Sequence, residues 1–229
     1  MLAFPVRGPR SKGFTLIELL VVIGIIGILV GVLAGVLGGG DKSAAMQSAQ
    51  GTLSSLLSSA RAQAALTGRD AAVAVNFNPT NNSDRYLRYC VVIVRNATNS
   101  SQWDVVNEGY YLPAGVYIVP PTPPTGAALE AGVSFTVSST GFDTDSTART
   151  FNSSTAEGPW LELGINSLGG RVTVGGTAAT GSNVVLALAN PQPPGTTPPI
   201  KFSSAYNIRG FSISKYGVAS FINDANGFN

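Results

Sequence analysis

The stretch KGFTLIELLVVIGIIGIL, residues 12–29, opens an apolar run that continues to Leu37. From Phe14 to Leu37 the run holds a single charged residue, Glu18. About 20 apolar residues are enough for a helix to cross a bilayer, so we expect residues 14–37 to form a transmembrane helix. The residues before the run are basic, and basic flanks stay on the cytoplasmic side. This predicts a single pass, with the N-terminus in the cytoplasm and the rest of the chain outside.

Glu18 is the unusual residue of this run, because a carboxylate inside a membrane costs about 2.5–3.5 kcal/mol on insertion scales. Two ordinary interpretations stay open. A secretory signal peptide would be cut after Ala34, but its apolar region is typically about 7–15 residues long. A plain signal anchor fits the length but gains nothing from the carboxylate. A cut between Gly13 and Phe14 would instead place a new ammonium group four residues before Glu18, on the same helix face.

The same stretch resembles the class III leader and N-terminal helix of type IV pilins and type II secretion pseudopilins. The resemblance implies that residues 1–13 are a cytoplasmic leader, that a prepilin peptidase cuts after Gly13, and that it methylates the amine of Phe14. It also implies that Glu18 pairs with a neighbouring subunit during assembly. Gly35 stands where many major pilins have a helix-loosening proline, and glycine too weakens a helix, by about 1 kcal/mol.

The partners and the location follow from the same resemblance. The implied partners are other pilin-like subunits, the prepilin peptidase, the inner membrane and the assembly platform of a secretion or pilus machine. The implied location is the inner (cytoplasmic) membrane, with the head periplasmic or extracellular, and a pseudopilus after assembly.

Four glycines lie three or four residues apart in the run: Gly24, Gly27, Gly31 and Gly35. At this spacing they share one side of a helix, and small residues let helices approach closely in a membrane. We expect the stripe to serve helix packing, although glycine is in any case frequent in transmembrane helices.

Residues 38–67 predict a linker followed by an amphipathic helix. Asp41 and Ser43 are suitable caps for a second helix after the triple glycine at 38–40, and Gly68 suits its end. If the triple glycine does not break the helix, a single helix runs from Phe14 to Thr67 and is about 80 Å long at 1.5 Å per residue. Seven apolar residues recur at helical spacing and predict the buried face: Met46, Ala49, Leu53, Leu56, Leu57, Ala60 and Ala64.

Residues 68–229 predict a β-rich head, because β-branched residues alternate with polar ones over short segments. The expected strands are 71–77, 86–96, 103–112, 115–119, 133–139, 160–165, 171–174, 183–189, 200–205 and 208–214. The proline-rich stretches 119–126 and 190–199 are expected to be surface loops. The fold class is therefore α+β, with a long N-terminal helix whose second half packs on a mostly antiparallel sheet.

The head has a weaker resemblance of its own. SSARAQAALTGRDAAVAV (58–75) is similar to the helix end and first strand of the H-type minor pseudopilins and of FimT-like minor pilins. IRGFSISKYGVASF (208–221) resembles their closing hairpin, with Lys215-Tyr216-Gly217 at the turn. The resemblance implies a minor pseudopilin, a structural subunit of a type II secretion pseudopilus that supports protein secretion. The alternative is a minor type IV pilin whose head binds DNA or a surface.

The composition argues against an enzyme. The 229 residues include no histidine and one cysteine, Cys90, which excludes histidine-dependent nucleophiles, histidine-ligated metals and an internal disulfide. We expect no catalytic residues, no metal and no cofactor, and Cys90 buried as a small apolar residue. The net charge is +2, with Arg7, Arg10 and Lys12 at the N-terminus, so nucleic acid is not an expected partner.

Two groups of residues in the head are candidate binding sites, one for calcium and one for nucleic acid. Asp143, Asp145 and Thr147 could supply oxygen ligands to calcium, but a solvated turn is the favoured interpretation. Three arginines of one strand region lie beside tyrosines and suit nucleic acid, but a solvated strand face is the default: Arg85, Arg88 and Arg95, with Tyr86 and Tyr89.

Overall fold

The structure is a computed structural model that describes residues 15–80, 83–100, 102–106, 108–145, 158–173, 176–179 and 182–228. Within residues 28–41 it describes the helical backbone but not the side chains. The chain divides into two compact units, Met1–Asp41 and Lys42–Asn229, and each unit is taken by itself below.

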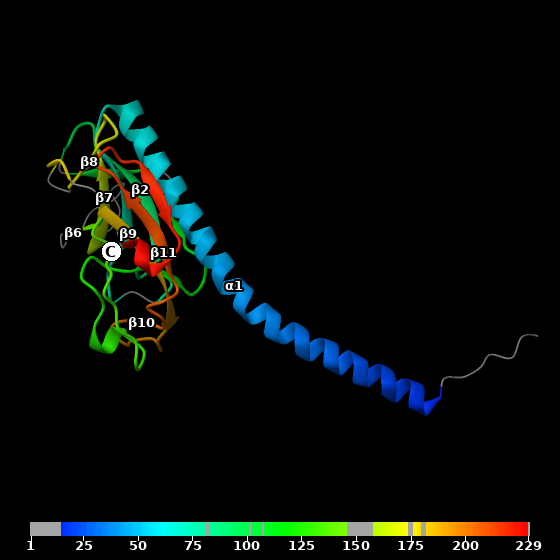
Figure 1. Ribbon diagram of the computed structural model, residues 1–229. Helices are drawn as coiled ribbons and strands as arrows, with labels where there is room; N and C mark the ends of the chain where they lie inside the picture. Colours follow the sequence, from blue (N-terminus) through cyan, green and yellow to red (C-terminus); the bar gives the residue numbers. More distant parts are fainter. Residues whose placement is uncertain are drawn as a thin grey trace, which may run out of the picture. The chain divides into compact units, whose positions relative to one another are not determined.

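One long helix, α1 (Leu16–Thr67), begins in the first unit and ends in the second (Figure 1). Of the two interpretations of the sequence, a second helix capped by Asp41 or Ser43 is wrong, because α1 runs through both residues, and a single helix that continues through the triple glycine to Thr67 is confirmed. Extending a helix adds one hydrogen bond for each residue fixed, whereas a new helix must be nucleated. Three glycines therefore do not end it. Gly68 does, with φ of +68° and its N–H donating to the carbonyl of Ala64 at 3.0 Å, as expected of a helix-terminating glycine.

In the first unit, the large apolar side chains between Leu16 and Ile26 are 49% to 82% exposed. Within the part of the chain that the structure describes, no helix is both long and apolar enough to cross a membrane. The assignment of residues 14–37 to the membrane thus stays a prediction.

The second unit contains two antiparallel sheets, where the sequence predicts one. The seven-stranded sheet has the order β3-β2-β1-β7-β6, with β4 beside β2 and β8 beside β7. Its strands are β1 (Ala71–Asn76), β2 (Tyr89–Arg95), β3 (Trp103–Val105), β4 (Tyr110–Tyr111), β6 (Asp143–Asp145), β7 (Trp160–Ile165) and β8 (Arg171–Val172).

The five-stranded sheet has the order β10-β9-β11-β12, with β5 beside β9. Its strands are β5 (Val116–Ile118), β9 (Ser182–Pro191), β10 (Ile200–Phe202), β11 (Ile208–Ile213) and β12 (Ala219–Ile222). Short 3₁₀ turns, η1 (Gly126–Ala128) and η2 (Ala225–Phe228), complete the described elements. The strand pairs are antiparallel, which confirms the α+β class.

The core lies where the second half of α1 meets the sheets, and the predicted helix face is confirmed. All seven of its residues are at most 4% exposed, and they form one cluster with apolar side chains of both sheets. The other face of the seven-stranded sheet has a smaller buried cluster around Trp103 and Trp160. Cys90 lies in β2 and is buried, as predicted.

Three expectations about strands and turns are wrong. The predicted strand 103–112 is two short strands, β3 and β4. Residues 133–139 form no strand, although Phe135 and Val137 are buried alternately as the pattern predicts. The Ser139 hydroxyl takes the place of a ladder bond, because its Oγ accepts from the N–H of Val185 at 2.8 Å and donates to the Val185 carbonyl at 3.3 Å. Conversely, the predicted turn at 141–147 contains β6, in which Asp143 pairs with Glu162 of β7.

The two sheets are joined by a buried arginine that no motif in the sequence indicates. Arg171 of β8 is 3% exposed. Its guanidinium donates to the carbonyl of Gly141 at 2.7 Å, to the carbonyl of Gly164 in β7 at 3.3 Å, and to the Ser182 hydroxyl in β9. Buried charges are tolerated when their donors are satisfied, and here the acceptors come from both sheets.

Candidate assembly site

The start of α1 is closed by a reciprocal pair of hydrogen bonds between Thr15 and Glu18. The backbone N–H of Thr15 donates to Glu18 Oε2 at 2.8 Å, and the Thr15 hydroxyl donates to the same oxygen at 2.9 Å. The backbone N–H of Glu18 in turn approaches Thr15 Oγ1 at 3.3 Å. This is a capping box, in which each of two residues at a helix start accepts, through its side chain, a hydrogen bond from the backbone N–H of the other.

The capping box corrects one inference from the sequence. A plain anchor does gain from Glu18, because the carboxylate satisfies a backbone donor and lies at the positive end of the helix. The pattern Thr-x-x-Glu before an apolar run is a known sign of such a cap, so Thr15 could have been found from the sequence. Among the described residues, the hydrogen bonds of the Glu18 side chain all go to Oε2.

The processing residues Gly13 and Phe14 lie outside the described residues, so their cleavage and methylation stay predictions. Gly24 and Gly27 lie in α1, and a Cβ built on either would meet no atom within 4 Å. The fold of this single chain therefore does not require glycine at these two positions. Gly31 and Gly35 lie in the part of α1 whose side chains are outside the described set. Helix packing by the stripe stays a prediction.

Two polar residues fix the second half of α1 to the head. Gln50 is 3% exposed, and its amide donates to the carbonyls of Gly210 at 2.8 Å and Ile222 at 3.0 Å. Arg61 donates to the carbonyl of Gly217 at 3.4 Å, and its guanidinium lies 3.1 Å from where a Cβ of Gly169 would be. Arg61, the arginine of the SSARAQAALTG stretch, thus contacts two loops of the head.

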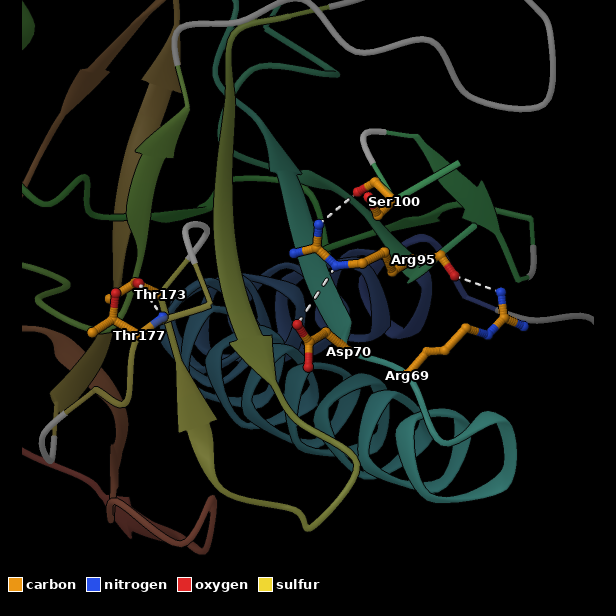
Figure 2. A network of polar contacts seen from close by, with 6 residues as sticks. All are labelled: Arg69, Asp70, Arg95, Ser100, Thr173 and Thr177. Atoms are coloured by element: carbon orange, nitrogen blue, oxygen red, sulfur yellow. Dashed lines mark hydrogen bonds and ion pairs between the residues drawn. The ribbon is translucent and has the colours of Figure 1, made fainter. Parts of the chain in front are cut away.

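A polar network joins the end of α1 to β2 (Figure 2). Arg69 donates to the carbonyl of Arg95 at 2.5 Å, and Arg95 donates to the carbonyl of Ser100 at 2.7 Å. The Nε of Arg95 lies 3.5 Å from a carboxylate oxygen of Asp70. Figure 2 also shows Thr173 beside Thr177, whose N–H donates to the Thr173 hydroxyl at 3.2 Å.

The three arginines that could suit nucleic acid, Arg85, Arg88 and Arg95, do not point freely into solvent. Each guanidinium lies over an aromatic ring: Arg85 over Tyr89 at 4.8 Å, Arg88 over Tyr111 at 5.9 Å, and Arg95 over Trp103 at 4.7 Å. Such stacking is a favourable contact for arginine. Arg88 also pairs with Asp84 at 3.1 Å. Arg95 likewise lies beside Asp70 at 3.5 Å, so at least two of the three charges have an acidic neighbour within the head.

The remaining candidates supply no chemistry of their own. Among the described residues no group of three or more histidine, cysteine, aspartate or glutamate side chains is placed to hold a metal ion. Asp143 and Asp145 lie in β6, and Thr147 lies outside the described residues. Burial raises the pKa of the Cys90 thiol to about 12, so this thiol stays protonated and unreactive at neutral pH.

Comparison with known proteins gives one match. Residues 8–34 match the family model described as the prokaryotic N-terminal methylation motif. The matched segment includes the predicted cleavage junction, the Thr15–Glu18 cap and the first part of α1. Neither a curated protein nor a solved structure matches the chain.

Proposed function

We propose that this chain, which carries the N-terminal methylation motif of type IV pilins and pseudopilins, is a structural subunit that polymerises through α1. The observation that carries the proposal is the motif at the start of a helix whose first residues are apolar and exposed. An exposed apolar surface of this kind requires a partner. Membrane before assembly and neighbouring α1 helices after assembly would both supply one.

The proposed life of the subunit has two stages. Residues 1–13 are removed by a prepilin peptidase, Phe14 becomes the methylated N-terminus, and residues 14–37 hold the chain in the inner membrane. Residues 68–229 form the head on the far side, carried by residues 38–67. The subunit then leaves the bilayer and joins other pilin-like subunits on the assembly platform.

Glu18 has two roles in this proposal. In the waiting subunit it completes the capping box with Thr15. In the fibre, its carboxylate receives the ammonium group of Phe14 from a neighbouring subunit. The cap favours one orientation of the carboxylate before assembly, so less side-chain freedom is lost when the neighbour arrives.

Two substitutions separate the cap from the charge. Glutamine at position 18 can still accept from the N–H of Thr15, because the capping box uses either glutamate or glutamine. Glu18→Gln should therefore keep the helix start but lose assembly, and Glu18→Ala should lose both. Both variants should be inserted and cut as usual.

The assay is crosslinking to other pilin-like subunits in membranes, with the intact mass of the extracted chain as the control for cleavage at Gly13. A Glu18→Gln variant that assembles like the unaltered chain would show that the charge is not used. A mature chain that starts after Ala34 would remove the proposal altogether.

Among the machines that use such subunits, we favour a type II secretion pseudopilus, with this chain as a minor subunit. The resemblance of residues 58–75 and 208–221 to H-type pseudopilins supports this choice. The alternative is a minor type IV pilin with a binding head. The ion pairs of Arg88 with Asp84 and of Arg95 with Asp70 weigh against DNA as its ligand. Retardation of DNA by the purified chain, with a steep dependence on salt, would favour that alternative.

We also propose that the subunit has no catalytic activity, no metal and no cofactor. The absence of histidine from the sequence and the protonated state of Cys90 support this.

A further inference from the structure

The last strand, β12, forms one end of the five-stranded sheet. It pairs with β11, and no strand in the described part of the chain pairs with its other edge. Phe221 in this strand is 55% exposed, and Val218 just before it is 52% exposed. An open edge presents backbone N–H and C=O groups to which another strand can add.

The strands at the other three ends of the two sheet orders carry charged residues, and β12 does not. β3 carries Asp104, β6 carries Asp143 and Asp145, and β10 carries Lys201. β12 has the sequence ASFI, residues 219–222, without a charge or a proline. Charged residues and prolines are usual means by which natural sheets discourage pairing at an edge. Among the described strands, β4 (YY) and β5 (VYI) also pair on one side only and lack both, but they are two and three residues long. β12 is the longest such uncharged edge, which marks it as an edge that accepts a partner.

The hydrogen bonds of the closing hairpin show which backbone groups of β12 face the open edge. Ser214 donates its N–H to the carbonyl of Val218 at 2.9 Å, so these two residues form a hydrogen-bonded pair. Bonded and non-bonded pairs alternate along an antiparallel ladder, and Ser220 therefore again bonds to β11. The N–H and C=O groups of Ala219 and Phe221 point away from β11, toward the open edge.

We infer that β12 pairs antiparallel with β12 of a second copy of this chain, with Ser220 facing Ser220 across a two-fold axis. In this register the outward backbone groups of Ala219 meet those of Phe221 from the second copy. A large side chain thereby lies opposite a small one on both sides of the axis, and cross-strand pairs of this kind stabilise sheets.

Charge favours the same arrangement. Lys215 lies in the turn before β12, and Asp224 lies two residues after the last residue of the strand, Ile222. In an antiparallel pair the basic end of one strand lies toward the acidic end of the other. Two copies of β12 carry no charge and do not repel each other. A second copy is therefore compatible with the charge of this edge, and its small and large side chains are complementary to those of β12.

A pair of four-residue strands buries far less than the roughly 1,200–2,000 Å² of a stable interface. Pairing therefore needs a high local concentration, which tethering of both chains to one membrane provides. In this respect the inference rests on the proposed function. The strand pairing itself goes beyond it, because it concerns the head and not α1.

The experiment uses the full chain in membranes of expressing cells under mild oxidation. Ser220→Cys places two thiols across the axis at a non-bonded pair, where Cα atoms are about 4.5 Å apart, which is within the range for a disulfide. The native thiol, Cys90, is buried and does not interfere. Thr196→Cys, at an exposed position of the loop after β9, is the matched control. We expect about tenfold more covalent dimer with Ser220→Cys than with Thr196→Cys, since only the former satisfies disulfide geometry.

Second substitutions in the Ser220→Cys chain test the edge. Phe221→Lys should abolish the dimer by placing a charge on the edge, whereas Phe221→Leu should keep it. Dimer no more abundant than in the Thr196→Cys control, or equally abundant with lysine and leucine at 221, would overturn the inference. A crosslink to a different protein in place of the second copy would also overturn it.

Fractionation of the same cells tests the membrane tether separately. A chain found outside the membranes would contradict the proposed function. A membrane-bound chain that forms no dimer would contradict the strand pairing.

Discussion

The side-chain amide of Gln50, in the middle of α1, donates a hydrogen bond to the carbonyl oxygen of Gly210 in β11 over 2.8 Å. The same nitrogen also donates to Ile222 in β12. One helix residue thus closes the end of the β11–β12 ladder inside the core. Gly210 must be a glycine there, because a Cβ would overlap with the carbonyl oxygen of Val184.

Replacement of Gln50 should destabilise the head. Gln50→Leu removes the donor from the buried carbonyl group of Gly210 and the partly buried one of Ile222, and an unsatisfied buried group costs about 1–3 kcal/mol. We expect the free energy of unfolding to fall by about that amount. Denaturant titration followed by fluorescence of the buried Trp103 and Trp160 measures it. Gln47→Leu, at an exposed position of the same helix, is the control, and an equal loss in both variants would contradict the role of Gln50.

A pair of alanine substitutions should have opposite effects. Gly210→Ala should prevent folding or cost several kcal/mol, because steric overlap with backbone in a core is among the severe mechanisms. Gly51→Ala should stabilise the head by about 1 kcal/mol, because Gly51 is inside α1 and a Cβ there meets nothing within 4 Å. Thermal unfolding by circular dichroism compares the two. A stable Gly210→Ala chain would mean that β9 and β11 separate at little cost.

Thr15 should matter for the helix start and not for cleavage. Thr15→Ala removes the hydroxyl of the capping box, a loss of about 0.5–2 kcal/mol, whereas Thr15→Ser retains it. We expect faster amide hydrogen exchange in residues 16–19 for alanine and nearly unchanged exchange for serine. The measurement is mass spectrometry of the detergent-solubilised chain. Equal exchange in both variants would contradict the cap.

Cys90 should resist thiol reagents in the folded chain. Its pKa is raised from 9.0 to about 12 by burial, so thiolate stays scarce when the pH is raised from 7 to 9. We expect no labelling by an aromatic disulfide reagent until denaturant is added. The thiol's contribution to stability is fully present below about pH 9, and it is lost as the pH rises toward 12. Rapid labelling of the native chain at pH 8 would contradict the burial.

Helical periodicity was the most informative signal in the sequence. It predicted the buried face of α1 from Met46 to Ala64, because a helix that covers a sheet must repeat its apolar side chains at a fixed spacing. The strands β1, β2, β7, β9 and β11 were likewise visible in their β-branched residues. These features are local, so a short window of sequence contains them.

The features that the sequence did not predict depend on distant residues. Residues 133–139 have the alternation of a strand, but whether a ladder forms is decided by Ser139 and Val185. The division into two sheets depends on which strands meet, and Arg171 joins them through acceptors from separate segments. The capping box was an exception, since Thr15 and Glu18 are only three residues apart and the pattern was present in the sequence.

The position of β1 between β2 and β7 has a consequence for the time course of synthesis. Ala71 pairs with Val94 on one side and with Ile165 on the other. At about 5–20 residues per second, a ribosome makes β2 within seconds of β1, but β7, roughly 90 residues downstream, follows about 5–18 s later. Throughout that interval one edge of the central strand is open. Translation therefore sets the minimum length of this vulnerable period, so a chaperone or slow-codon effect on this chain should act between residues 96 and 160.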